Sequence, residues 1–221
     1  MKKQLVRCAL ACALAISAEV HAALVTVNFD SFAGTTLVTG VAPLASIVTD
    51  DFLAQGILFG KTGKSAGSYV YNDTSAPGGK AACGLDAAGA IAPACKGDQY
   101  FSFVKPGDAS KTGATNSLSF LIGDQGGDLD SWILHVYDVN NVELEARAAS
   151  AVATTTQTFN YAAINHVWIQ MVSGPAGGYY LDNVQFNTPT VVLVPEPASM
   201  ALLGLGLAGI AAQRRRADLR Q

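Results

Sequence analysis

The clearest structural pattern in this chain is Trp132-Ile-Leu-His-Val-Tyr137-Asp-Val-Asn140-Asn141-Val-Glu-Leu-Glu-Ala146. Apolar and polar side chains alternate on both sides of Asn140-Asn141, a pair typical of a two-residue hairpin turn. Alternation with period two, rich in β-branched and aromatic residues, predicts half-buried strands. The segment therefore predicts an antiparallel β-hairpin.

Similar segments recur on both sides of this hairpin, and Gly, Asn, Asp and Ser separate them. They are Leu24–Phe29, Gly56–Phe59, Tyr100–Val104, Ser117–Ile122, Val167–Val172 and Tyr179–Phe186. Only Asp50–Gln55 resembles a helical turn. About eight or nine short strands without a fixed repeat predict an all-β domain, an antiparallel jelly-roll-like β-sandwich. Residues 60–99, rich in Gly, Ala and Ser, are expected to form a long excursion from the sandwich.

Charge is distributed unevenly over the 221 residues. Residues 23–194 hold seven basic and fourteen acidic side chains, a net charge of −7, and Arg147 is their only arginine. Nucleic-acid binding needs clustered basic groups, so this composition argues against it. The apolar content is too high for a disordered chain. Residues 23–194 are therefore expected to form one folded, acidic β-sandwich domain.

The N-terminus has the order of a secretory signal. A cationic start, Met1–Arg7, precedes the uncharged run Cys8–Ala18, and Val20-His-Ala22 places small residues before a cleavage site. This order predicts a signal peptide over residues 1–22, removed by signal peptidase, with a mature chain that starts near Ala23.

Removal of the signal peptide leaves two cysteines, Cys83 and Cys95. Two cysteines in an exported domain predict a disulfide, which would close a loop of about a dozen residues. A metal-binding pair and two free thiols are the alternatives.

The C-terminus, residues 195–221, has three parts. Pro195-Glu196-Pro197 comes first, an uncharged segment rich in Leu, Gly and Ala follows over residues 198–213, and then Arg214-Arg215-Arg216. The apolar segment is short for a membrane span, which takes about 20 residues. With Arg214 reaching to the interface, a transmembrane helix over residues 198–213 fits a thin bilayer. The arginines would keep the C-terminus in the cytoplasm.

This three-part end resembles the PEP-CTERM sorting signal. The resemblance implies a protein of a Gram-negative bacterium, exported and held briefly in the inner membrane. Its processing protease, an exosortase, would cut at or near Pro195-Glu196-Pro197. It also implies delivery to the cell surface or extracellular matrix, alongside exopolysaccharide and biofilm components. A plain C-terminal membrane anchor is the alternative.

The domain itself carries a second, shorter resemblance. Asn28-Phe-Asp30, Phe52 to Phe59 and Tyr180–Phe186 resemble exported β-sandwich domains of PEP-CTERM proteins, and the last segment resembles the final strand of some carbohydrate-binding modules. In such modules an acidic residue near the first strand and one in the last strand can hold structural calcium. The resemblance thus implies a calcium site at Asp30 and Asp182, with extracellular polysaccharide as a partner.

Two further binding features follow from the residues themselves. Asp124, Asp128 and Asp130 place three carboxylates in a glycine-rich loop of the kind that binds calcium, although the spacing is not that of an EF-hand. Tyr69, Tyr71 and Tyr179 are candidates for stacking on sugar, which requires exposed ring faces. Trp132 and Trp168 lie in apolar runs and are expected in the core.

Catalytic signals are weak. Gly63-Lys-Ser65-Ala-Gly67 fits a hydrolase nucleophile elbow, and Ser65, Asp138 and His166 occur in a suitable order. The elbow requires a helix after the serine, whereas Ser68–Tyr71 is strand-like. His135 and His166 are expected to be structural, so no catalytic residue is assigned. The sequence predicts a non-enzymatic surface or matrix protein; an exported glycan or ester hydrolase and a simply anchored adhesion module are the alternatives.

Overall fold

The computed structural model describes residues 22–32, 47–60, 67–72, 76–85, 95–123, 128–173 and 178–192. The strands are β1 (Leu24–Val27), β2 (Ile47–Val48), β3 (Ile57–Phe59), β4 (Ser68–Asn72), β5 (Lys80–Gly84), β6 (Gln99–Lys105), β7 (Asp108–Ala114), β8 (Leu118–Gly123), β9 (Asp130–Tyr137), β10 (Glu143–Ala151), β11 (Thr155–Phe159), β12 (His166–Ser173), β13 (Tyr180–Asn187) and β14 (Thr190–Val191). Two short 3₁₀ turns, η2 (Leu53–Gln55) and η3 (Pro77–Gly79), complete the described elements.

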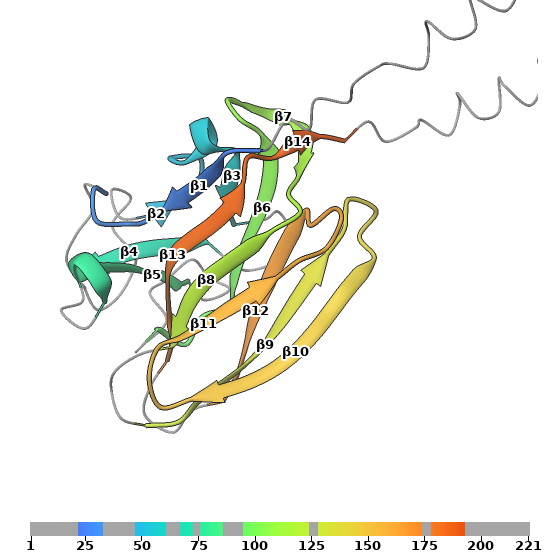
Figure 1. Ribbon diagram of the computed structural model, residues 1–221. Helices are drawn as coiled ribbons and strands as arrows, with labels where there is room; N and C mark the ends of the chain where they lie inside the picture. Colours follow the sequence, from blue (N-terminus) through green and yellow to red (C-terminus); the bar gives the residue numbers. More distant parts are fainter. Residues whose placement is uncertain are drawn as a thin grey trace, which may run out of the picture.

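The strands form two antiparallel sheets that face each other (Figure 1). The first sheet has the order β11-β8-β13-β5-β4-β2, with β1 also paired to β13. The second has the order β10-β9-β12-β6-β7-β14, with β3 also paired to β6. This arrangement confirms the predicted all-β antiparallel sandwich.

Alternation along the strands builds the core between the sheets. In β9, Trp132, Leu134 and Val136 are buried, whereas His135 and Tyr137 point to the other face of the second sheet. Side chains of the first sheet meet them from the opposite side, including Leu118, Phe120, Leu181 and Phe186. The core therefore belongs to both sheets, as the period-two pattern requires.

A second, smaller cluster lies apart from the main core. It contains Tyr69, Tyr71, Ala76, Ala81, Cys83, Leu85, Cys95 and Tyr180. The predicted disulfide joins Cys83 of β5 to Cys95, which confirms that pairing. Residues 60–99 are thus not merely an excursion: they supply β4 and β5, which lie between β13 and β2 in the first sheet.

The backbone of β5 approaches the residues after Cys95 so closely that glycine is needed at two positions. Gly84 and Gly97 form an antiparallel bridge, and a Cβ at Gly84 would lie 2.3 Å from the carbonyl oxygen of Gly97. No side chain fits at that distance, so glycine is required for the backbones to approach.

The central hairpin differs from its prediction at the turn. Tyr137 of β9 pairs with Glu143 of β10, so five residues, 138–142, connect the strands rather than two. Asp138 holds this loop, because its Oδ1 accepts the N–H groups of Asn140 and Val142, both at 2.8 Å. The predicted helical turn before Gly56 is present as η2.

The edges of the two sheets meet at β10 and β11. Arg147 of β10 donates from Nη1 to Gln157 Oε1 of β11 at 3.2 Å, and from Nη2 to the carbonyl of Thr158 at 3.4 Å. Its guanidinium carbon lies 4.3 Å from the centre of the Phe159 ring. Arg147 therefore connects β10 of the second sheet to β11 of the first sheet.

In the described ranges no helix is long and apolar enough to cross a membrane. The predicted signal peptide, apart from Ala22, and the predicted helix over residues 198–213 lie outside those ranges.

Candidate functional site

The outer face of the second sheet carries a continuous row of five aromatic rings. Its members come from three neighbouring strands: Tyr100 of β6, His135 and Tyr137 of β9, and His166 and Trp168 of β12. We call this set the outer aromatic row. Strand register creates it, because Trp168 pairs with His135 and Tyr100, and His166 pairs with Tyr137.

The rings of the outer aromatic row pack face to face. The ring centres of His135 and Trp168 are 4.7 Å apart at 18°, and those of Tyr137 and His166 are 4.7 Å apart at 17°. Tyr100 lies 5.3 Å from His166.

Hydrogen bonds fix one end of the row, at Trp168 and His135. Trp168 Nε1 donates to Asp98 Oδ2 at 3.0 Å, and the other oxygen of Asp98 accepts the N–H of Met171. His135 is held between Glu143 at 2.5 Å and Gln170 at 3.3 Å. These contacts hold the Trp168 and His135 rings in place.

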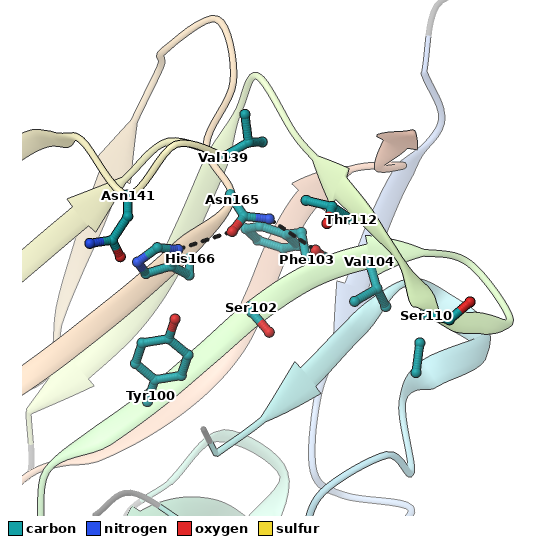
Figure 2. Close-up of a pocket in the computed structure, with 11 residues that line it drawn as sticks. Tyr100, Ser102, Phe103, Val104, Ser110, Thr112, Val139, Asn141, Asn165 and His166 are labelled. Atoms are coloured by element: carbon teal, nitrogen blue, oxygen red, sulfur yellow. Dashed lines mark hydrogen bonds between the residues drawn. The ribbon is translucent and has the colours of Figure 1, made fainter. Parts of the chain in front are cut away.

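Asn165 sets the orientation of His166 at the other end. Its Nδ2 donates to the carbonyls of Phe103 and Gly113, at 3.2 and 2.7 Å, so its Oδ1 can only accept (Figure 2). The Nδ1 atom of His166, 3.0 Å from that oxygen, is therefore the donor.

A pocket of about 310 Å³ opens beside His166. Its lining comprises Tyr100, Ser102, Phe103, Val104, Ala109, Ser110, Thr112, Val139, Asn141, Asn165 and His166. Figure 2 shows Tyr100, Ser102 and His166 lying next to one another at this opening. Hydroxyl, amide and imidazole groups line it together with apolar side chains, and among the described residues no carboxylate, lysine or arginine does.

The phenols of the row stay neutral. Burial raises the pKa of Tyr100, and the nearby Tyr137 raises it further. Burial likewise raises the pKa of Tyr137, with Glu143 adding to the effect. Both hydroxyl groups therefore stay protonated at physiological pH. Tyr100 lines the pocket and Tyr137 does not; the hydroxyl, amide and imidazole groups of the lining suit a neutral, hydroxyl-rich ligand.

A second candidate site surrounds Asp182. This carboxyl of β13 is fully buried; its Oδ1 accepts the N–H of Asn183 at 2.7 Å, and its Oδ2 has no hydrogen-bond partner. Asn183 has φ +46° at an irregularity in the pairing with β8. The pairing of β13 with β8 is therefore irregular next to the buried carboxyl.

Asp30 lies near this buried carboxyl. Burial raises the pKa of Asp182 to about 6, the N–H groups of Asn183 and Phe29 oppose that rise, and the charge of Asp30 adds to it. A Cβ on Gly78 of η3 would lie 2.0 Å from Asp30 Oδ1. Two carboxylates with an unsatisfied, buried oxygen fit a hard cation such as calcium. In the part of the chain that is described, no three His, Cys, Asp or Glu side chains cluster as a metal site.

The acidic loop is only partly described. Asp124 lies outside the described residues, as does most of the segment before Asp128. Asp130 is buried at the start of β9, and Oδ2 of Asp128 is enclosed without a hydrogen bond. Calcium binding by Asp124, Asp128 and Asp130 stays a prediction.

The exposed tyrosine platform predicted from sequence is wrong. Tyr69, Tyr71 and Tyr179 are 1%, 8% and 0% exposed. Tyr179 donates to the carbonyls of Gly97 and Ile169, whereas Tyr69 and Tyr71 pack in the small cluster beside the disulfide. The rings have no free face for a sugar, because the small cluster covers Tyr69 and Tyr71 and the main core covers Tyr179.

Trp132 is in the core as predicted, but Trp168 points to the outer face instead. Sequence reasoning therefore missed the outer aromatic row. Alternation around Leu134 already placed His135 and Tyr137 on the non-core face. His166, Trp168 and Tyr100 lie beside them only because of the register between strands, and a local sequence pattern does not predict that register.

The hydrolase triad gains no support from the described part. Ser65 lies outside it. Asp138 caps the β9–β10 loop, and Nδ1 of His166, which a triad would direct to the aspartate, bonds to Asn165.

Residues 193–216 match the PEP-CTERM protein-sorting motif. The match contains Pro195-Glu196-Pro197 and Arg214–Arg216, which lie outside the described residues. It confirms the resemblance inferred from sequence, and the motif indicates an exported protein whose C-terminal anchor an exosortase processes. No curated protein matches the chain in sequence.

Several solved structures are similar to this chain at low identity. The K2 adhesin domain of Lys-gingipain is 16% identical with a TM-score of 0.39, over 75% of this chain and 99% of that one. The CBM22-1–GH10 modules of Clostridium thermocellum xylanase 10B are 12% identical with a TM-score of 0.34, over 72% and 30%. The N-terminal cellulose-binding domain of Cellulomonas fimi β-1,4-glucanase C is 11% identical with a TM-score of 0.25, over 73% and 99%.

Proposed function

We propose that this protein is a non-catalytic, polysaccharide-binding component of the cell surface or extracellular matrix of a Gram-negative bacterium. The sorting motif supports export and exosortase processing. The pocket beside His166 supports the binding role, since hydroxyl, amide and imidazole groups line it and no carboxylate, lysine or arginine of the described residues does. Neutral sugar residues offer the complementary hydroxyl groups, and a matrix exopolysaccharide would supply them.

Affinity electrophoresis of the mature domain through gels containing the host's exopolysaccharide tests this role. Tyr100→Phe removes one pocket hydroxyl and leaves the ring in place. Tyr161→Phe is the matched control, because Tyr161 donates to Glu145 and does not line the pocket. Loss of one hydrogen bond should weaken retardation by Tyr100→Phe about three- to tenfold. Equal retardation of both variants would argue against the pocket as the binding site.

The proposal includes a structural calcium ion held by Asp30 and Asp182. The observation behind it is the buried, unpartnered Oδ2 of Asp182 next to a second carboxylate. Calcium prefers six to eight oxygen ligands, so backbone carbonyls or water would have to complete the set. The ion would offset the charge repulsion between the two aspartates and join β13 to the segment after β1.

Thermal unfolding with and without calcium tests this site. A bound ion stabilises the folded state by mass action, so 1 mM calcium at about 100 times its dissociation constant should add about 2.7 kcal/mol. Asp182→Asn should lose that gain. Asp108→Asn, which removes a partly exposed carboxylate on β7, should retain it. A calcium response that survives Asp182→Asn would contradict the assignment.

A further inference from the structure

Both ends of the described domain lie at one end of the sandwich. The N–H and Oγ1 of Thr188 donate to the carbonyl of Ala23, at 2.8 and 2.9 Å. Immediately afterwards β14 pairs with β7, where Val191 lies opposite Gly113 and Val192 N donates to the carbonyl of Thr112 at 3.1 Å. Figure 1 shows β14 beside β7 at this end. We call it the β7 end.

Backbone hydrogen bonds to β7 extend as far as Val192, a few residues before the predicted cleavage motif Pro195-Glu196-Pro197. Pro195 is three residues beyond Val192. The apolar segment starts at Ala198, six residues beyond Val192. A fully extended chain covers at most about 3.5 Å per residue, so these distances cannot exceed about 10 and 20 Å. The headgroup layer of one leaflet takes up about 6 Å of that span. The β7 end is therefore tethered very close to the membrane as long as the anchor is intact.

The exposed side chains at the β7 end suit such a position. Leu24 and Val191 are 65% and 43% exposed, and Lys105 and Lys111 are exposed on either side of the β6–β7 turn. Asp108 lies between these lysines, which help to lower its pKa together with hydrogen bonds from Ser110. Lysines near a bilayer are attracted to its phosphates, and short apolar side chains are tolerated at the interface.

The predicted signal-peptide cleavage site agrees with this geometry. Ala22 and Ala23 directly precede β1, and Ala23 is bonded to Thr188. Both membrane-associated segments of the precursor would therefore leave the domain at the β7 end.

We propose that, before exosortase cleavage, the short tether holds the β7 end against the phospholipid headgroups of the membrane that carries the anchor. The far end of the sandwich, where β10 turns into β11, points away from the bilayer. This inference depends on the C-terminal anchor and is independent of polysaccharide binding.

Fluorescence quenching of residues 23–221, which lack the signal peptide with Cys8 and Cys12 but keep the C-terminal anchor, tests the orientation in liposomes. Lys111→Cys places a label on β7, and Val152→Cys places one at the far end, where Val152 is 55% exposed. The Cys83–Cys95 disulfide leaves the added thiol as the labelling site in each mature domain. With a quencher on lipid headgroups, quenching at position 111 should exceed that at 152 about threefold or more, because an eight-residue strand spans about 27 Å. Equal quenching at the two positions overturns the proposal.

A variant with a longer spacer tests whether the short tether causes the quenching at position 111. About twenty Gly and Ser residues inserted between Val192 and Leu193 would let the domain move about 25 Å from the anchor. Quenching at position 111 should then fall toward the value at 152. Unchanged quenching overturns the role of the tether. Quenching that requires added exosortase overturns the lipid contact and favours contact with the protease.

Discussion

Asp182 illustrates how one residue links stability to pH. Its carboxyl has a pKa of about 6 in the folded domain, above the value of 3.8 for an unperturbed aspartate. Between these values the folded state binds more protons than the unfolded state, so stability falls as pH rises. In chelator, the free energy of unfolding should drop by about 2 kcal/mol from pH 4 to pH 7 through this group.

Urea denaturation across that pH range measures the effect. Asp182→Asn keeps the side-chain volume and a carbonyl acceptor for Asn183, so it should flatten the profile. Other carboxyls with lowered pKa values, such as Glu145, contribute the opposite slope at lower pH. The difference between the two proteins isolates Asp182, and a difference that does not change with pH would contradict the assigned protonation.

At the scale of elements, Arg147 joins the edge strands of the two sheets. Arg147→Lys keeps the positive charge but cannot reproduce the planar contacts with Thr158 and the Phe159 ring. We expect a loss of about 1 kcal/mol in the free energy of unfolding, measured with urea. Lys111→Arg, an exposed change on β7, should be neutral within about 0.5 kcal/mol. Equal effects of the two substitutions would mean that the β10–β11 contact contributes little.

The disulfide constrains β5 and the small cluster around it. Cys83 and Cys95 are 12 residues apart, and a loop of about this length gives roughly 3 kcal/mol by the chain-entropy estimate. The double variant Cys83→Ala, Cys95→Ala should therefore unfold at a lower urea concentration than the oxidised protein. Adding a reductant should destabilise the parent toward the variant and leave the variant unchanged. A variant as stable as the oxidised parent would show that the bond is redundant.

Elements with regular alternation were predictable, whereas polar or short ones were not. The segments that became β9, β12 and β13 carry β-branched and aromatic residues at period two, so local sequence identifies them. β7, which reads Asp108-Ala-Ser-Lys-Thr-Gly-Ala114, has no apolar face. It is a strand because β6 and β14 pair with it, and pairing between distant segments is not encoded locally.

The same limit applies to the candidate sites. Asp30 and Asp182 could be paired from sequence only through resemblance to other modules, whereas their proximity requires the fold. Tyr69 and Tyr71 were misjudged because alternation shows that two side chains share a face but not whether another segment covers it. The outer aromatic row needed the register of three strands. Whole-molecule geometry, rather than residue type, decides which polar or aromatic face is available to a ligand.

At the scale of the whole molecule, the predicted cleavage site lies just outside the folded domain. The sorting motif begins at residue 193, directly after the last described residue, Val192. Cleavage at or near Pro195-Glu196-Pro197 would therefore release the sandwich with every described strand from β1 to β14 intact. The mature protein from its native host should have a mass that lacks both the signal peptide and the arginine-bearing tail. A strain without its exosortase should retain the tail.

Intact mass spectrometry of the two strains measures this difference. Pro195→Ala with Pro197→Ala should resemble the exosortase-free strain, because the residues before each proline would no longer be kept extended. Pro189→Ala is a control, since Pro189 precedes β14 and lies outside the motif. A mature protein that keeps its arginines in both strains would leave a simply anchored envelope protein as the better interpretation. The β7 end would then face the membrane throughout the life of the protein rather than only before cleavage.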